Sequence, residues 1–298
     1  MKVGLQIPSF TWPGGPEAIG LTLGRIVRDA DAAGFDSIWV MDHFFQIRGV
    51  GQPEEPMLEG WTTLGFMAAH SQRARLGLMV GGVHYRQPAL WIKAATTLDV
   101  LSGGRAWLGI GAAWNEDESR GLGFAFPPLG ERFDLLEDTL AMAHAMWSGD
   151  HGTDQPLDGH ATHATRMLNS PQSLSRPRVP IMVGGGGEKK TLRLVARYAD
   201  ASNVFGAPEA IARKYAILAE HCAAIGRDPD EIERSTLQTI NPTSDGARGS
   251  ETPTQIIDRF GELSDAGAQH VIFSVRDISD PARLDVVGRE IIPALRAL

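Results

Sequence analysis

Eight short apolar runs, each followed by a segment of helical periodicity, constrain this chain more than any other feature. The runs lie at 3–7, 36–41, 75–80, 105–110, 179–183, 201–205, 234–240 and 269–274. Strands that alternate with helices imply right-handed crossovers and a parallel sheet. Eight such units in 298 residues predict a closed TIM (β/α)8 barrel and not an open sheet.

The segments between the runs are expected to be helices. After the first run, for example, Ile19, Leu23, Ile26, Val27 and Ala30 share one helical face. The expected helices occupy 19–30, 57–69, 88–101, 133–147, 188–198, 208–224, 254–265 and 281–295. Because α/β barrels reach about 250 residues or more as one unit, we expect a single domain over residues 1–298.

Two connections exceed the ~2–6 residues usual in α/β units. Residues 114–130 follow the fourth strand, and residues 148–178 precede the fifth. The fold class is therefore a TIM barrel with insertions after strand 4 and before strand 5. The first insertion leaves the carboxyl end of a strand, where barrel active sites lie, so it is expected to form a lid or a substrate wall.

Composition excludes several classes of partner. The net charge of -8 repels nucleic acid and anionic membranes, so neither is expected to bind. No apolar run approaches the ~18 residues of a membrane span, and the start MKVGLQIPSF lacks the pattern of a secretory signal. We therefore expect a cytoplasmic protein. Its one cysteine, Cys222, is expected to be a small buried apolar residue.

Asp42 and His43 directly follow the second strand. In a barrel, this position faces the active site. A carboxylate and an imidazole there can bind the polar edge of a ring and move a proton. The alternative is a histidine buried by hydrogen bonds among its aromatic neighbours.

Glycines follow the third, fourth and fifth strands. Gly81 and Gly82 would let a flat ligand approach the backbone, although the pair alone is a weak signal. Gly109 and Gly111 resemble half of a dinucleotide fingerprint, but the third glycine and the acidic residue are missing, which excludes that motif. Gly184 to Gly187 lead into a helix, where free backbone N–H groups favour an anion such as phosphate.

No metal site is expected. His160 and His163 have H-x-x-H spacing but lie in a polar loop without a helix or a cysteine to fix their geometry. The acidic run of Glu116, Asp117 and Glu118 is expected to face solvent, although its place after the fourth strand would allow one member to reach the site.

The chain resembles the luciferase-like monooxygenase superfamily, and within it the branch of oxidoreductases that use coenzyme F420. The resemblance covers nearly the whole chain and is strongest at 34–46, 73–90, 97–118 and 180–200. It departs from the glucose-6-phosphate dehydrogenases of that branch at Ile47, where those enzymes carry a tryptophan. Oxidation of a sugar phosphate is therefore not expected.

The resemblance implies specific roles for residues of this chain. It places Asp42 and His43 beside the deazaflavin ring, with His43 as the catalytic residue, and it places a non-prolyl cis peptide that backs the ring at Met79-Val80. Further cofactor contacts are implied at Gly82, Ala112, Ala113 and Asp117. Gly186 and Gly187 match the phosphate-binding turn of the family, in agreement with the argument from the glycine run.

These observations predict an oxidoreductase that transfers a hydride between coenzyme F420 and a small organic substrate. Two alternatives remain: an FMN-dependent luciferase-like monooxygenase, and a flavin-binding barrel without catalysis. The partner is expected to be a small molecule, and the resemblance also leaves a homodimer open.

Overall fold

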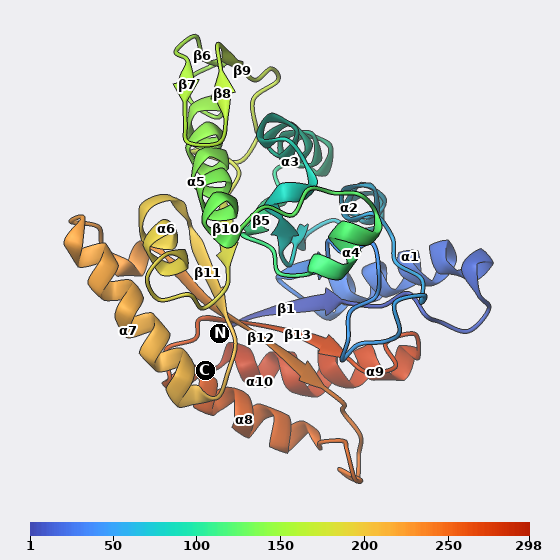
Figure 1. Cartoon of the computed structure of the whole chain (residues 1–298). Helices are drawn as coiled ribbons and strands as arrows, with labels where there is room; N and C mark the ends of the chain where they lie inside the picture. Colours follow the sequence, from blue (N-terminus) through green and yellow to red (C-terminus); the bar gives the residue numbers. More distant parts are fainter.

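The computed structural model describes residues 1–298 and contains a closed ring of eight parallel strands, surrounded by helices (Figure 1). The strands are β1 (Lys2–Ile7), β2 (Ser37–Val40), β3 (Arg75–Leu78), β5 (Ala106–Gly111), β10 (Ile181–Gly184), β11 (Ala201–Val204), β12 (Glu233–Ile240) and β13 (His270–Val275). They pair in chain order, and β13 pairs with β1 to close the ring. The predicted TIM barrel is confirmed.

The helices lie outside the ring and cover it. They are α1 (Pro16–Ala33), α2 (Gly60–His70), α3 (Pro88–Ser102), α5 (Leu129–Met146), α6 (Thr191–Tyr198), α7 (Pro208–Ala224), α8 (Pro253–Asp265), α9 (Pro281–Val286) and α10 (Ile292–Arg296). A π-helical turn at Val287–Ile291 separates the last two, which the sequence predicted as one helix. Helix α2 begins later than predicted because the Glu59 carboxylate accepts the N–H groups of Trp61 and Thr62 and caps the helix there.

The two insertions have structure of their own. The first contains the short helix α4 (Glu116–Gly121). The second forms two small antiparallel pairs, β6 (Gly152–Thr153) with β9 (Met167–Leu168) and β7 (Leu157–Asp158) with β8 (His163–Ala164). They make an arm beyond the end of α5 (Figure 1). Asp138 of α5 holds the arm by accepting three backbone N–H groups, those of residues 160–162.

Two tryptophans fill the middle of the barrel. Trp39 of β2 and Trp107 of β5 lie on either side of Gly77 of β3, and their ring centroids are 6.1 Å apart. A Cβ on Gly77 would lie 2.5 Å from the Trp39 ring, so only glycine leaves room for both indoles. The interior is therefore a packed core, and ligands can enter only at its ends. No helix is both long enough and apolar enough to cross a membrane.

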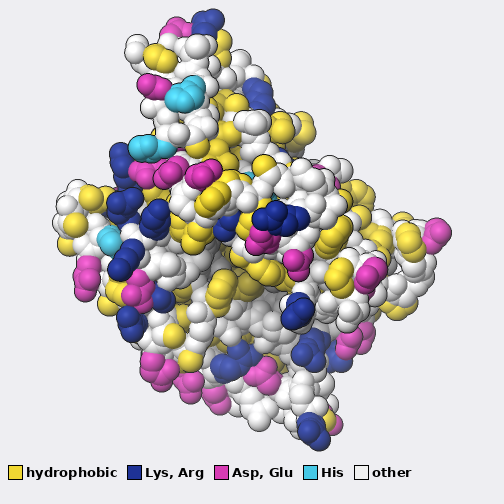
Figure 2. Space-filling model, in the orientation of Figure 1, with side chains coloured by type: hydrophobic (Ala, Val, Ile, Leu, Met, Phe, Trp, Pro, Cys, Tyr) yellow, Lys and Arg dark blue, Asp and Glu magenta, His cyan; other side chains and the backbone are white.

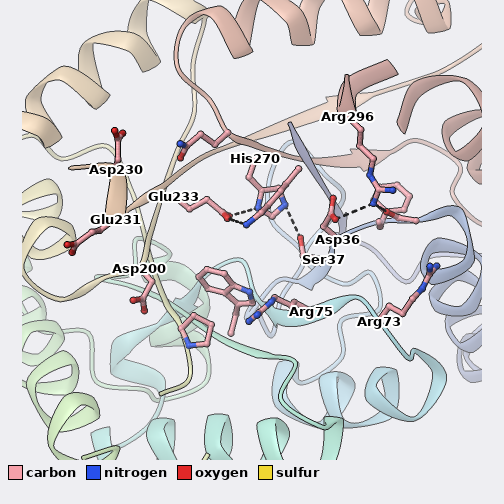
Figure 3. A pocket seen from close by; sticks show the side chains of 16 residues that line it. Asp36, Ser37, Arg73, Arg75, Asp200, Asp230, Glu231, Glu233, His270 and Arg296 are labelled. Carbon is pink, nitrogen blue, oxygen red and sulfur yellow. Dashed lines mark hydrogen bonds and ion pairs between the residues drawn. The ribbon is translucent and has the colours of Figure 1, made fainter. Parts of the chain in front are cut away.

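The amino ends of the strands enclose a polar hollow of about 780 Å³ (Figure 3). On its inner wall, His270 joins two side chains: its Nδ1 lies 2.7 Å from Glu233 Oε1, and its Nε2 lies 3.0 Å from Ser37 Oγ. A carboxylate, an imidazole and a hydroxyl in this order resemble the groups that activate a serine nucleophile. Ser37, however, is 1% exposed, and its oxygen also accepts the Trp39 indole N–H at 2.7 Å. We conclude that the three side chains seal the base of the barrel.

We expect the Glu233 carboxylate to stabilise the fold above pH 4.5. Burial alone would raise the pKa of Glu233, but His270 and Lys2 outweigh burial and lower that pKa to about 2. A carboxyl whose pKa is lower in the folded chain loses its stabilising effect as the pH falls from the unfolded value, 4.5, to the folded value. Glu233→Gln should remove about 3 kcal/mol of this pH-dependent stability.

Urea unfolding at several pH values measures the effect. Between pH 5 and pH 3 the parent should lose stability more steeply than Glu233→Gln. Glu231→Gln is a matched control because the Glu231 side chain is 62% exposed and its ion pair with Arg227 is weak. Equal slopes for the parent and Glu233→Gln would contradict this role of the carboxylate.

Candidate functional site at the barrel mouth

The opposite end of the barrel, where the strands finish, carries most of the predicted site. The Val80 side chain lies at this mouth, against the ends of two strands. A Cβ on Gly184 would lie 2.7 Å from Val80 Cγ2, and a Cβ on Gly111 would lie 3.1 Å from the same atom. The two glycines end the neighbouring strands β10 and β5 and so make room for Val80. The Met79-Val80 peptide is cis, as the resemblance implied, and Met79 lies in the barrel interior beside Trp39.

Asp42 is buried at the mouth and bonded to protein donors. Its carboxylate is 3% exposed and forms two 2.8 Å bonds with the Arg86 guanidinium, while the Gly82 N–H donates to it at 3.2 Å. Arg86 also bonds to Glu59 at 2.5 Å. Burial alone would lower the pKa of Arg86, but the two carboxylates raise it. Asp42 was expected to touch a cofactor directly. In the structure its oxygens face the Arg86 guanidinium and the Gly82 N–H, and the expected contact with a cofactor stays a prediction.

His43 is held by a buried carboxylate. Its Nδ1 lies 2.5 Å from Oε1 of Glu118, a side chain with no solvent exposure. The same oxygen accepts the Tyr85 hydroxyl, and Oε2 accepts the N–H groups of Phe44 at 2.7 Å and Phe45 at 3.0 Å. Burial alone would raise the pKa of Glu118, but the bonds from His43, Phe45 and Tyr85 lower it. Glu118 is therefore an ionised carboxylate with four donors.

Helix α4 is a wall fixed to the strand ends. Next to Glu118, Ser119 accepts from His84 Nε2 at 2.8 Å and donates to the Asn115 carbonyl at 2.8 Å. Burial, together with Arg132, lowers the pKa of His84 to about 4, so that this imidazole is neutral near pH 7. Beyond the helix, Phe124 stacks on Phe44 with ring centroids 5.2 Å apart. The first insertion thus closes one side of the mouth.

Most of the other predicted residues also border the mouth. Gly82 lies two residues after Val80, and a Cβ there would lie 2.7 Å from the Tyr85 ring. The Ala112 carbonyl accepts from Arg132 Nε at 2.9 Å, and Ala113 has a positive φ of 62°. Asp117 is the exception, since its side chain is exposed on α4 and forms no hydrogen bond or ion pair.

The glycine turn after β10 has free donors. The Gly185 N–H donates to the Asn203 carbonyl at 2.9 Å, whereas the N–H groups of Gly186 and Gly187 have no partner in the chain. Lys214 of α7 passes close by, since a Cβ on Gly186 would lie 3.5 Å from its Cε. Figure 2 shows Lys and Arg side chains, with some acidic ones, over α6 and α7. Unpaired amides in a basic setting can hold an anion.

Sequence reasoning missed two residues that build this site. Glu118 was expected to face solvent with Glu116 and Asp117, but α4 is too short to show a helical period that would separate its faces. Arg86, the partner of Asp42, follows the Gly81-Gly82 pair and gave no signal. Exposed apolar side chains also border the mouth: Trp114 is 63% exposed and packs edge-on against His43, with ring centroids 5.5 Å apart.

The model of the luciferase-like monooxygenase family matches residues 1–248 of this chain. The chain belongs to the luciferase-like monooxygenase family. Among curated relatives, the F420-dependent glucose-6-phosphate dehydrogenase of Beutenbergia cavernae is 27% identical, over 90% of this chain and 91% of the relative. The family acts on small molecules with a cofactor. The match to this relative agrees with the resemblance to F420-dependent oxidoreductases found in the sequence.

Two solved structures share the fold of this chain. An F420-dependent secondary alcohol dehydrogenase in complex with an F420-acetone adduct superposes with a TM-score of 0.83 at 16% identity, covering 99% of both chains. The oxygenating constituent of 3,6-diketocamphane monooxygenase from Pseudomonas putida, in complex with FMN, gives a TM-score of 0.75 at 15% identity, covering 98% of both chains. At these identities the likeness establishes the barrel alone.

Proposed function

We propose that this chain transfers a hydride between coenzyme F420 and a small organic substrate at the barrel mouth. The observation that carries the proposal is the convergence, at one end of the barrel, of an oriented imidazole, an apolar platform and an anion-binding turn. His43, Val80 and Gly186 supply these three features. The F420-dependent dehydrogenase of Beutenbergia cavernae, matched over nearly its whole length, supports F420 as the cofactor.

The residues present fit such a cofactor. Val80 is flanked by glycines that carry no side chain, which leaves a flat apolar surface against which a ring can lie. The unpartnered N–H groups of Gly186 and Gly187 suit a phosphate, and Lys214, whose Nζ pairs with Glu188 Oε1 at 2.7 Å, lies beside them. Gly111 and Gly184 end adjacent strands, so platform and turn lie at the same edge of the barrel.

When bound, F420 accepts or supplies the hydride. The chain supplies the proton movement that balances it: a substrate that gives up a hydride from carbon also releases a proton, and His43 is placed to take that proton. Reduction reverses both transfers. Trp114 packs edge-on against the His43 ring on this side of the mouth, beside the α4 wall.

FMN is the principal alternative, because it also has a flat ring and one phosphate. The FMN-bound diketocamphane monooxygenase, which shares the fold, supports this alternative. A barrel that binds a flavin without catalysis is less favoured, because Glu118 orients an imidazole that simple binding does not need.

Titration of the purified chain with F420 and with FMN, followed by fluorescence, tests the choice of cofactor. We expect a lower dissociation constant for F420, followed by reduction or oxidation of the bound deazaflavin when small alcohols, carbonyl compounds or enones are added. Tighter binding of FMN would replace F420 as the cofactor. Failure of both to bind would remove the redox proposal.

Gly186→Asp tests the phosphate site. A carboxylate at this position would repel phosphate and could pair with Lys214, so cofactor affinity should fall at least several-fold, each ~1.4 kcal/mol being a factor of ten. Gly186→Ala is the matched control, because a Cβ there meets Lys214 at an ordinary 3.5 Å. Equal affinity of the folded Gly186→Asp variant and the parent would place the phosphate elsewhere.

A further inference from the structure

We propose that Glu118 is a positioning residue that fixes the tautomer of His43, so that His43 Nε2 is the atom that exchanges a proton with substrate. The inference rests on the proposed function for its catalytic consequence. The tautomer itself is a property of the chain and can be measured without cofactor.

The donors around Glu118 determine where the His43 proton lies. An ionised carboxylate only accepts hydrogen bonds, and its two oxygens have about four lone-pair directions. All four are used, by the Phe44 and Phe45 N–H groups, the Tyr85 hydroxyl and His43 Nδ1. At 2.5 Å from an acceptor-only oxygen, Nδ1 must carry a hydrogen. In the neutral ring, Nε2 is therefore the unprotonated nitrogen.

Nε2 is also the ring nitrogen that a substrate can reach. It has no hydrogen-bond partner in the chain, and it is not among the buried polar atoms that lack one, so it is open to solvent. The side chain as a whole is 14% exposed, which leaves little of the ring accessible apart from this edge. Trp114 packs against the ring and limits its rotation.

The position of Glu118 is itself well determined. Two of its donors are backbone N–H groups in the loop that follows β2, which cannot rotate away as side chains can. Helix α4 is held beside them by Ser119, and a Cβ on Gly121 would lie 3.1 Å from the Phe45 ring. Fixed donors and a fixed helix leave the Glu118 carboxylate one orientation. Because Oε1 of that carboxylate bonds to His43 Nδ1, the His43 ring is oriented as well.

Glu118→Gln should reverse the His43 tautomer. An amide has one oxygen and one NH₂ group. The oxygen must face the two backbone N–H groups, because the NH₂ group would clash with them. The NH₂ group then points at His43 Nδ1, which becomes an acceptor, and the ring hydrogen moves to Nε2. In a Ser-His-Asp triad the corresponding carboxylate-to-amide change preserves geometry and lowers turnover about 10⁴-fold.

Nitrogen-15 NMR of the histidine rings in the chain without cofactor reads the tautomer, and His43→Asn assigns the His43 signals. We expect an Nδ1–H ring in the parent and an Nε2–H ring in Glu118→Gln. Tyr85→Phe removes one donor but keeps the carboxylate, so it should retain the parental tautomer. Glu116→Gln makes the same change on the exposed face of α4 and should alter neither the tautomer nor turnover.

Turnover and its pH profile, measured with a substrate that the parent uses, provide the second readout. Glu118→Gln should lower kcat by about 10²–10⁴ per folded molecule, change the pH profile and leave the dissociation constant of F420 nearly unchanged. Adding Glu118→Gln to His43→Asn should cause little further loss, because the glutamate acts through the histidine.

The outcomes separate this inference from the proposed function. An Nδ1–H ring that persists in Glu118→Gln, or an unchanged kcat in that variant, would overturn the positioning role. A fully additive loss in the double variant would show that Glu118 acts independently of His43 and would also overturn the positioning role. If the parent has no F420-dependent activity, the proposed function fails, and the tautomer measurement alone decides whether Glu118 positions His43.

Discussion

The Glu118 carboxylate is the interaction on which the barrel mouth depends. It joins the loop after β2, the segment after β3 and the insertion after β5, three parts of the chain that are far apart in sequence. Removing a partner from a buried charge is costly, because the remaining groups stay unpaired and unhydrated. The same carboxylate thus fixes the α4 wall in place and orients the imidazole that faces the mouth. Stability and the proposed chemistry rest here on one side chain.

The two ends of the barrel illustrate how similar groups acquire different roles. At the base, His270 lies between Glu233 and Ser37, and both ring nitrogens have protein partners. At the mouth, His43 has a carboxylate at one nitrogen and an open second nitrogen. A histidine with two partners stabilises the fold, whereas one with a free nitrogen can exchange a proton. The hollow at the base is therefore not the better candidate for catalysis.

The sequence predicted the barrel well because each strand is a contiguous apolar run and each helix has its own period. It also located His43 and the glycine turn, since both directly follow a strand and a barrel places strand ends together. It could not find Glu118, because a six-residue helix has too few turns to distinguish a buried glutamate from its exposed neighbours. The pairing of Asp42 with Arg86 is a tertiary contact between separate loops, which no local pattern records.

A crystal structure of the chain bound to F420 tests the central claim most directly. We expect the deazaflavin ring to lie against Val80 on the side of His43 Nε2, with phosphate oxygens accepting the N–H groups of Gly186 and Gly187. The Asp42 carboxylate should keep its two bonds to Arg86. A cofactor bound in the hollow at the base of the barrel, or a phosphate away from the glycine turn, would contradict the proposed site.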